Sequence, residues 1–371
     1  MKIVINCRSF LKPNFTGIGR YAHNLVHHLS DIPQTHQYFL YAPIKWFDRK
    51  RKPPYIAKNN FVTKIDRFGR GPGKVLKNFD IYHSPSPAMI EEMDAKIIVT
   101  VHDLVYKAFP QGHTEETLRL TDEQFKNFLP RVSRLLCTSK NTAADLKKYF
   151  QVDDSKTSVI YSGVDKKAFY PVPAEEIPAA QKTVLNKGVD QKFILYVGTI
   201  EPRKNLDNLL KVFSQLKEEK KFNGKLVIAG MKGWKSESFD KNLKKFGIHN
   251  DVVVLGFLKN EELRHFYATC EVFVFPSFYE GFGFPIIEAF NCGAAVITSN
   301  VSSCPELAGD AALTVDPNDI QQMTDSIITV LNDEKLREDL RARGLQRAEE
   351  FSFQRTAEET LRVYEEVYSG C

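Results

Sequence analysis

The sequence predicts an α/β protein made of two doubly wound parallel sheets. The first observation is length: 371 residues exceed the roughly 250–300 residues that one hydrophobic core usually serves. The second is that short apolar runs alternate with segments of helical period, which is typical of parallel strands joined by helices. The third is a proline-rich stretch over 170–178, which separates two halves of similar organisation.

The N-terminal half starts with an apolar strand over 2–7, a glycine-containing loop over 14–20 and a helix over 21–30. Further strands are expected at 38–41, 81–83, 96–101, 134–138 and 157–160. We assign 1–170 to the first domain and 171–190 to a linker.

The C-terminal half restarts the same alternation, and we assign 191–350 to the second domain. Strands are expected at 193–198, 226–229, 252–255, 272–275, 295–298 and 312–315. Helices are expected at 206–217, 236–246, 260–269, 285–293, 320–331 and 333–349, and a final one within 351–371. Ligands of doubly wound sheets bind at the carboxyl ends of the strands, so a cleft that the two domains face is the expected site.

Composition limits the class of protein. A hydrophobic content of 43% with 12% aromatic residues is enough for two packed cores and excludes disorder over most of the length. No apolar run reaches the ~18 residues of a membrane-spanning helix, and residues 1–6 lack the organisation of a signal peptide. The six cysteines are scattered without a CxxC pair, which favours buried thiols in a reducing cytoplasm over disulfides or a metal site.

The positive charge is concentrated at the N-terminal end. Residues 1–80 hold fifteen Lys/Arg and four Asp/Glu, a balance of +11, although the whole chain carries only +5. Within 45–77 the basic residues are mixed with Trp46, Phe47 and Phe68. That mixture suits the headgroup layer of an anionic membrane, and a solvated basic loop explains it equally well. No nucleic-acid-binding module is present, so charge alone does not predict a nucleic-acid partner.

The most specific motif runs from residue 278 to 290. It places Glu280 and Glu288 eight positions apart, with Gly281 and Gly283 between them and Pro285 at the start of an expected helix. A helix start beside flexible backbone offers unpaired N–H groups to an anion. Two neighbouring carboxylates can accept hydrogen bonds from sugar hydroxyls. The segment therefore offers phosphate and polyol recognition together.

This motif resembles the Glu-x7-Glu signature of retaining glycosyltransferases with the two-Rossmann GT-B fold, specifically glycosyltransferase family 4. The resemblance implies that Glu280 lies by the donor sugar, that Glu288 holds the ribose hydroxyls, and that the backbone from Gly281 to Ile286 faces sugar and diphosphate. It also implies an acceptor-binding N-terminal domain, a nucleotide-sugar-binding C-terminal domain, and a last helix that crosses back to the N-terminal domain.

A second segment, 197–206, follows the first strand of the C-terminal half. Two adjacent cations, Arg203 and Lys204, can neutralise a diphosphate that gains charge as it leaves. The segment resembles the diphosphate loop of the family, with Lys204 at the phosphate-binding lysine. Thr199 departs from the arginine that many members carry there, so Arg203 shares that role. The form Gly-Thr-x-Glu-Pro-Arg-Lys resembles bacterial mannosyltransferases of polysaccharide assembly.

Other positions match the family more weakly. Gly17 and Gly19 form a glycine turn after the first strand, His102 ends another strand, and Gly256 with Phe257 is expected to wall the nucleotide base. The expected catalytic residues are His102, Glu280, Arg203 and Lys204. The expected donor-binding residues are Gly17, Gly19, Thr199, Arg203, Lys204, Gly256, Phe257, Glu280, Gly281, Phe282, Gly283, Phe284, Pro285, Ile286 and Glu288.

The sequence thus predicts a metal-independent retaining glycosyltransferase without a cofactor, cytoplasmic or peripheral on the inner face of the membrane. The resemblance favours mannose from GDP-mannose as donor and a lipid-linked or polysaccharide acceptor. No Asp-x-Asp pair, zinc-spaced cluster or P-loop occurs in the sequence,. A sugar-nucleotide epimerase or hydrolase of the same fold and a non-catalytic nucleotide-binding protein remain open.

Overall fold

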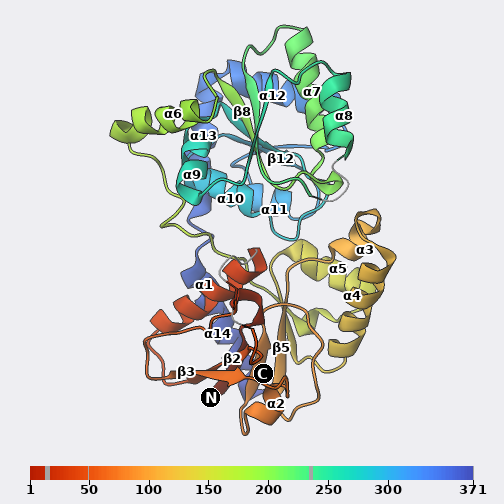
Figure 1. Cartoon of the computed structure of the whole chain (residues 1–371), viewed down its shortest axis with the longest axis vertical. Helices are drawn as coiled ribbons and strands as arrows, with labels where there is room; N and C mark the ends of the chain where they lie inside the picture. Colours follow the sequence, from red (N-terminus) through yellow and green to blue (C-terminus); the bar gives the residue numbers. More distant parts are fainter. Residues whose placement is uncertain (13–16, 49, 234–236, 371) are drawn as a thin grey trace. The chain divides into compact units, whose positions relative to one another are not determined.

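The computed structural model describes residues 1–12, 17–48, 50–233 and 237–370. The chain forms two compact units, each built around its own parallel sheet (Figure 1). Unit 1 consists of Met1–Gly163 and Phe353–Cys371, and unit 2 consists of Val164–Ser352. Among the described helices, none combines the length and the apolar character needed to cross a membrane.

The sheet of unit 1 has seven strands in the order β3-β2-β1-β4-β5-β6-β7, and each neighbouring pair is parallel. The strands are β1 (Lys2–Asn6), β2 (Gln37–Pro43), β3 (Phe61–Asp66), β4 (Ile81–Ser84), β5 (Lys96–Val101), β6 (Arg134–Cys137) and β7 (Thr157–Val159). Ile3 and Ile5 belong to one hydrophobic core and Val4 to another, because successive side chains of a strand point to opposite faces. Both faces are therefore covered, as a parallel sheet requires.

Helices α1 (Gly17–Asp31) and α14 (Phe353–Ser369) contact each other and share the core that contains Ile3 and Ile5 (Figure 1). The other core includes side chains from α4 (Glu115–Phe128) and α5 (Lys140–Phe150). The unit also contains the short helices α2 (Pro72–Val75) and α3 (Val105–Ala108). The hydroxyl of Tyr364 on α14 lies 2.6 Å from Nδ1 of buried His83 on β4. The C-terminal helix thus returns to the N-terminal unit, as predicted.

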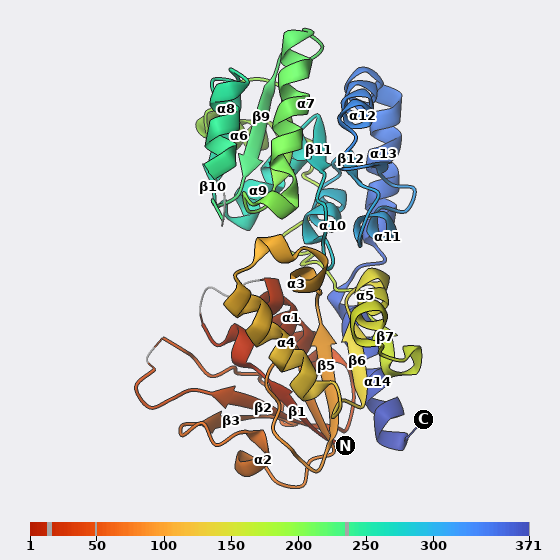
Figure 2. The same ribbon diagram turned by 90° about the vertical axis from the view of Figure 1, so that its right-hand side faces the viewer.

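The sheet of unit 2 has six parallel strands in the order β10-β9-β8-β11-β12-β13. They are β8 (Phe193–Val197), β9 (Lys225–Ala229), β10 (Val252–Gly256), β11 (Val272–Phe275), β12 (Val296–Ser299) and β13 (Leu313–Val315). The helices are α6 (Ile177–Asn186), α7 (Leu206–Glu218), α8 (Glu237–Lys245), α9 (Asn260–Thr269), α10 (Phe284–Asn291), α11 (Cys304–Ala308), α12 (Ile320–Asn332) and α13 (Glu334–Ala348). Figure 2 shows α7 beside α8, and α12 beside α13.

Two details of the N-terminal half differ from expectation. The predicted loop over 17–20 is wrong, because α1 already begins at Gly17; residues 14–16 lie outside the described residues. Glycine is tolerated in a first helical turn, where backbone N–H groups lack helical partners anyway. Strand β3 escaped prediction because it lies at the edge of the sheet and buries only its two end residues.

Residues 171–190, expected as a linker, contain α6. Its buried residues Ala180 and Val184 lie one helical turn apart, and the helix packs on α9. An i, i+4 apolar pair is the minimum for such a packed face. The proline-rich segment before it forms a short 3-10 helix, Ala174–Glu176.

Candidate active site

The candidate site lies at the carboxyl ends of the unit 2 strands. The strand order reverses between β8 and β11, which are neighbours although two strands, β9 and β10, separate them in sequence. Ligands of doubly wound sheets bind at such a switch point. Strand β8 leads into the 3-10 turn Pro202–Lys204, and β11 leads into the loop that carries Glu280. This topology brings the two motifs together.

Glu280 is the centre of an ion cluster with both predicted cations. Lys204 Nζ donates to Oε1 of Glu280 at 2.6 Å, and Arg203 donates to Oε2 at 3.0 Å. The same guanidinium also donates to the Tyr279 carbonyl at 2.7 Å and to Glu201 at 2.5 Å. Two carboxylates thus balance two cations.

Burial makes this cluster electrostatically strong. Glu280 is only 6% exposed and Lys204 only 8%. Burial alone would raise the pKa of Glu280, but the charges of Arg203 and Lys204 overcome it and lower the pKa to about 2. Burial lowers the pKa of Lys204, an effect that the charge of Glu280 opposes. Each ion is therefore held in its charged form by the other.

Serine side chains fix the backbone of Glu280. Ser302 Oγ accepts from the Glu280 amide at 3.0 Å and donates to its carbonyl, while Ser303 Oγ lies 3.0 Å from that carbonyl and 2.5 Å from the Phe282 carbonyl. Both serines follow β12, the next strand of the sheet. Ser302, Ser303 and Glu201 are not among the expected site residues. Glu201 lies within the Gly-Thr-x-Glu-Pro-Arg-Lys form, which was the only signal for it, and the two serines carry no pattern of their own.

The loop between Glu280 and α10 depends on glycine. Gly283 has φ of +113°, and a Cβ there would lie 3.2 Å from Leu307 Cδ1 and 3.3 Å from Ile286 Cδ1. The neighbouring rings of Phe282 and Phe284 pack edge-on at 5.1 Å. Proline follows as the second residue of α10, and the Ile286 amide donates to the Gly283 carbonyl at 3.0 Å. This arrangement sets the tight turn that the motif predicts.

Glu288 lies on the buried side of α10, 7% exposed. The hydroxyl of Tyr267, on α9, donates to its Oε2 at 3.3 Å. Tyr267 is itself fully buried, and burial together with the Glu288 charge raises its pKa well above the usual value. The tyrosine therefore stays protonated and serves as a donor that orients Glu288. Nothing in the linear spacing of residues 267 and 288 indicated this contact.

Two further strand ends extend the same edge of the sheet. Thr199 follows β8 and is exposed, and Gly256 ends β10 with φ of +67°. Phe257, directly after it, is 74% exposed, and the exposed side chain of Met231 follows β9. An aromatic face left open at this edge is suited to stack on a planar base.

The remaining predicted residues, Gly17, Gly19 and His102, belong to unit 1. His102 follows β5; its Nε2 lies 2.8 Å from the Pro85 carbonyl, and its ring packs edge-on to Tyr21 at 4.9 Å. Burial lowers the pKa of His102 although the Pro85 carbonyl and Asp103 oppose the shift. A carbonyl can only accept, so the neutral ring carries its proton on Nε2 and leaves Nδ1 as an acceptor.

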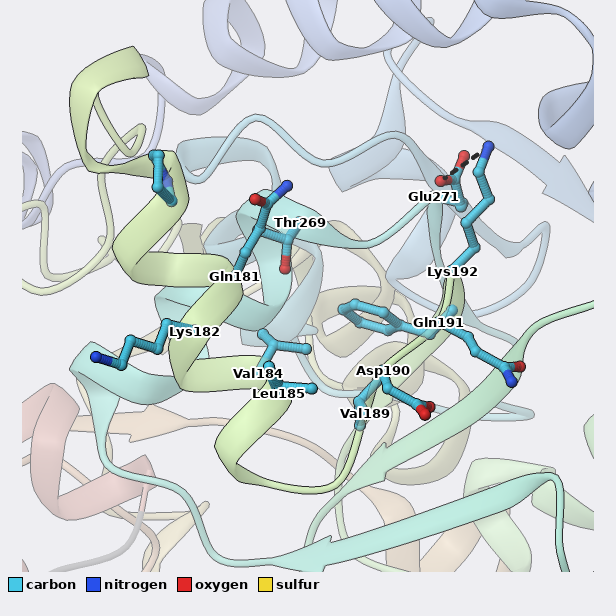
Figure 3. Close-up of a pocket in the computed structure, with 12 residues that line it drawn as sticks. Gln181, Lys182, Val184, Leu185, Val189, Asp190, Gln191, Lys192, Thr269 and Glu271 are labelled. Atoms are coloured by element: carbon cyan, nitrogen blue, oxygen red, sulfur yellow. Dashed lines mark ion pairs between the residues drawn. The ribbon is translucent and has the colours of Figure 1, made fainter.

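A hollow of 600 Å³ lies elsewhere on unit 2 and does not belong to this site (Figure 3). Its lining includes Lys182 and Leu185 of α6, Phe193 at the start of β8, and Thr269 with Glu271 just before β11. These are the amino ends of the strands, the opposite edge of the sheet from Glu280.

Family models match both halves of the chain. A family model described as glycosyl transferases group 1 matches residues 179–347, and one described as glycosyltransferase family 4 matches residues 15–168. The O-antigen chain mannosyltransferase B of Escherichia coli is 29% identical over 98% of this chain and 99% of that one.

Solved structures share the fold. Sucrose-phosphate synthase of Thermosynechococcus elongatus superposes with a TM-score of 0.78 at 20% identity, covering 100% of both chains. HepE of Anabaena, solved with UDP and glucose, superposes with a TM-score of 0.71 at 16% identity over 98% of this chain and 99% of that one. The two family models together span most of both units, and with the fold they show that this chain belongs to the group 1 glycosyltransferases of family 4, which have the GT-B fold.

Proposed function

We propose that this glycosyltransferase transfers mannose, with retention of configuration, from GDP-mannose to a hydroxyl of a lipid-linked or polysaccharide acceptor. The observation that carries the proposal is the buried cluster of Glu280, Arg203 and Lys204 at the switch point of unit 2. Support for mannose comes from the similarity to an O-antigen mannosyltransferase along nearly the whole chain.

The ion cluster suggests how the donor is held. A diphosphate brings at least two negative charges to a cluster whose own charges cancel. Lys204 and Arg203 can turn from Glu280 toward the phosphates, and the freed Glu280 carboxylate can accept hydroxyls of the donor sugar. The cations then stabilise charge that develops on the leaving diphosphate, and such electrostatic stabilisation is usually the largest single contribution to catalysis.

The proposed reaction uses no protein nucleophile, because the freed Glu280 carboxylate holds the donor sugar by its hydroxyls. The proposed reaction is front-face attack: the acceptor oxygen bonds to the anomeric carbon as the bond to the diphosphate breaks, and a phosphate oxygen takes the acceptor proton. His102, neutral and protonated at Nε2, is proposed to contact the donor sugar through Nδ1. Neither step requires a metal ion.

The remaining assignments belong to the same proposal. Unit 1 would bind the acceptor and contribute Gly17 and Gly19 to donor binding. Unit 2 would bind the nucleotide through Thr199, Gly256, Phe257, the 281–286 backbone and Glu288. The enzyme would work in the cytoplasm at the inner face of the membrane, with the basic residues 45–77 near anionic lipid.

Incubation of the pure protein with radiolabelled nucleotide sugars and bacterial lipid extract tests the proposal. Labelled lipid from GDP-mannose supports it. Free mannose or an epimer without an acceptor product would instead support a hydrolase or epimerase. Binding without turnover across the whole panel would leave a nucleotide-binding protein and overturn the proposal.

A further inference from the structure

The loops after β2 and β3 expose a group of large aromatic side chains. Trp46 is 70% exposed, Phe47 80% and Phe68 68%, and the rings of Trp46 and Phe68 lie 6.4 Å apart. Each would be costly to leave in water, and an apolar group of this kind on a surface marks an interaction site. We call Trp46, Phe47 and Phe68 the aromatic patch.

Cations sit on the rings of this patch. Arg67 lies 5.6 Å from the centroid of Trp46, Arg70 5.4 Å from Phe68, and Lys45 6.0 Å from Phe47. Among the described residues, none of these three cations forms an ion pair. The acidic residues nearby are already engaged: Asp48 pairs with Arg51, and Asp66 accepts from the Tyr41 hydroxyl and the Gly71 amide. The aromatic patch is therefore surrounded by three cations whose positive charge is not balanced by an ion pair within the described part of the chain.

A polar pocket of 330 Å³ opens beside the patch. Its lining includes Met89 and two residues next in sequence to the patch, Lys45 beside Trp46 and Gly69 beside Phe68. Its other walls come from the carboxyl ends of three neighbouring strands, through Asn6 of β1, Pro43 of β2 and Asp66 of β3, together with Glu91 and Arg8. This is the ligand-binding edge of a parallel sheet. Carboxylate, amide and tyrosine hydroxyl groups meet cations there, a mixture suited to a phosphorylated sugar.

We propose that the patch and this pocket form one lipid-binding site: the aromatic rings and cations enter the headgroup layer of an anionic bilayer, and the pocket receives the polar head of a lipid. Aromatic side chains with an apolar body and long cationic side chains favour this interfacial layer. Anionic lipid supplies the charge that the cations lack within the protein. As a deepening of the proposed function, and resting on it, the lipid that enters the pocket is the phosphate-linked sugar acceptor.

Co-sedimentation of the whole protein with vesicles tests the surface without any assumption about activity. We expect binding to vesicles of phosphatidylglycerol and phosphatidylcholine, little binding to phosphatidylcholine alone, and weakening with salt. Each cation near such a membrane raises the binding constant by about five-fold. Removing two of them in Arg67→Gln/Arg70→Gln is therefore expected to weaken vesicle binding by about 25-fold. Trp46→Ser/Phe47→Ser/Phe68→Ser is expected to leave only weak, salt-sensitive binding.

The matched control is Lys148→Gln/Lys245→Gln. These exposed lysines also lie over aromatic neighbours, Tyr149 at 4.9 Å and Phe246 at 5.7 Å, but are remote in sequence from the patch. Equal loss in the control and the arginine variant would overturn the proposal, as would wild-type binding that ignores lipid charge. Binding of single-stranded RNA without vesicle binding would assign the surface to nucleic acid and also overturn it.

The acceptor is tested separately, with lipid extract reconstituted into the anionic vesicles and GDP-mannose as donor. The aromatic variant is expected to lose about tenfold or more of the transfer rate, whereas GDP should raise its Tm as in the wild type, which reports an intact unit 2. Full transfer by that variant would overturn the acceptor assignment. If the wild type transfers no sugar from any nucleotide sugar, the proposed function fails. The vesicle experiment still tells whether the aromatic patch binds anionic lipid.

Discussion

At the scale of single residues, the site depends on charges that compensate each other out of water. Glu280 is buried against two cations, and its carboxylate remains ionised because they are there. Removing one member leaves an uncompensated buried charge, which is usually more damaging than removing the whole set. Single substitutions here are therefore informative about both stability and chemistry.

Lys204→Ala is expected to lower kcat by about 100-fold or more, because one donor to a developing oxyanion contributes at least that much. Lys204→Arg should recover part of the rate, since the charge is kept while the geometry changes. Steady-state kinetics with GDP-mannose measure both. Lys241→Ala, an exposed position on α8, is the control and should retain the wild-type rate. A near-normal rate for Lys204→Ala would remove this lysine from the reaction.

Glu288→Ala is expected to raise the Kd for the nucleotide more than it changes kcat, because the proposed contacts to ribose are present before and during the reaction. Isothermal titration with GDP measures the first effect and steady-state kinetics the second. Tyr267→Phe, which removes the hydroxyl that orients Glu288, should weaken nucleotide binding less than Glu288→Ala. A pure loss of kcat in Glu288→Ala would contradict this role.

Acid should uncouple the cluster. The pKa of Glu280 is lowered to about 2 in the folded protein from an ordinary value of 4.5, so its stabilising effect is complete above pH 4.5 and disappears as pH falls toward 2. The free energy of unfolding of the wild type should exceed that of Glu280→Gln at pH 6, and the gap should narrow through this window. Urea titrations at several pH values measure it. A gap that stays constant with pH would contradict the ionised state of Glu280.

At the scale of elements, two local devices hold the parts in place. Glycine at φ of +113° allows the chain to turn from Glu280 into α10. Burial lowers the pKa of His83 to about 3, so this histidine is neutral where it meets Tyr364 of α14 and Thr100 of β5. Each device can be tested by a change confined to its element.

Gly283→Ala should destabilise unit 2 by about 1–2 kcal/mol or more, because an L-residue is strained at this φ and the added Cβ crowds Leu307 and Ile286. Thermal unfolding measures the loss. Gly17→Ala is the control: this glycine is helical with nothing within 4 Å of the added Cβ, so its Tm should stay level or rise. Equal destabilisation by both changes would exclude the strain at Gly283 as the cause.

Docking of α14 should weaken in acid. The folded pKa of His83 lies below the ordinary 6.5, so the unfolded state binds the proton more readily and stability falls as pH drops from 6.5 toward 3. The protection factors of α14 amides, which correct for the intrinsic slowing of exchange in acid, should fall over this range more than those of α13 amides. In His83→Asn the α14 amides should lose most of this pH dependence; an unchanged profile would exclude His83 as its source.

At the scale of the whole molecule, the chain is two sheets that share one continuous polypeptide, with the last helix returned to the first unit. A ligand should stabilise the unit to which it binds, so thermal unfolding can show which unit binds the nucleotide. GDP is expected to raise the Tm of the unit 2 transition. At 100 times its Kd, GDP should increase the free energy of unfolding of unit 2 by about 2.7 kcal/mol. UDP and ADP at equal concentration should shift it less. A larger shift with UDP or ADP would contradict GDP-mannose as the donor.

The sequence by itself determined the two parallel sheets, because strands buried on both faces appear as apolar runs between helical segments, as at 193–198 and 272–275. It also determined the family, through Glu280, Glu288 and the Arg203–Lys204 pair. It missed β3, whose edge position leaves only its two end residues buried, and the start of α1 at Gly17.

Only the tertiary structure decided which groups meet. Ser302 and Ser303 contact Glu280, Glu201 is joined to it through Arg203, and Tyr267 holds Glu288, although 21 to 79 positions of sequence separate these residues from the two glutamates. The physical reason is that hydrogen bonds and ion pairs act over a few ångströms in space. Local propensity fixes each strand and helix, whereas the order of strands in the sheet decides which loops become neighbours.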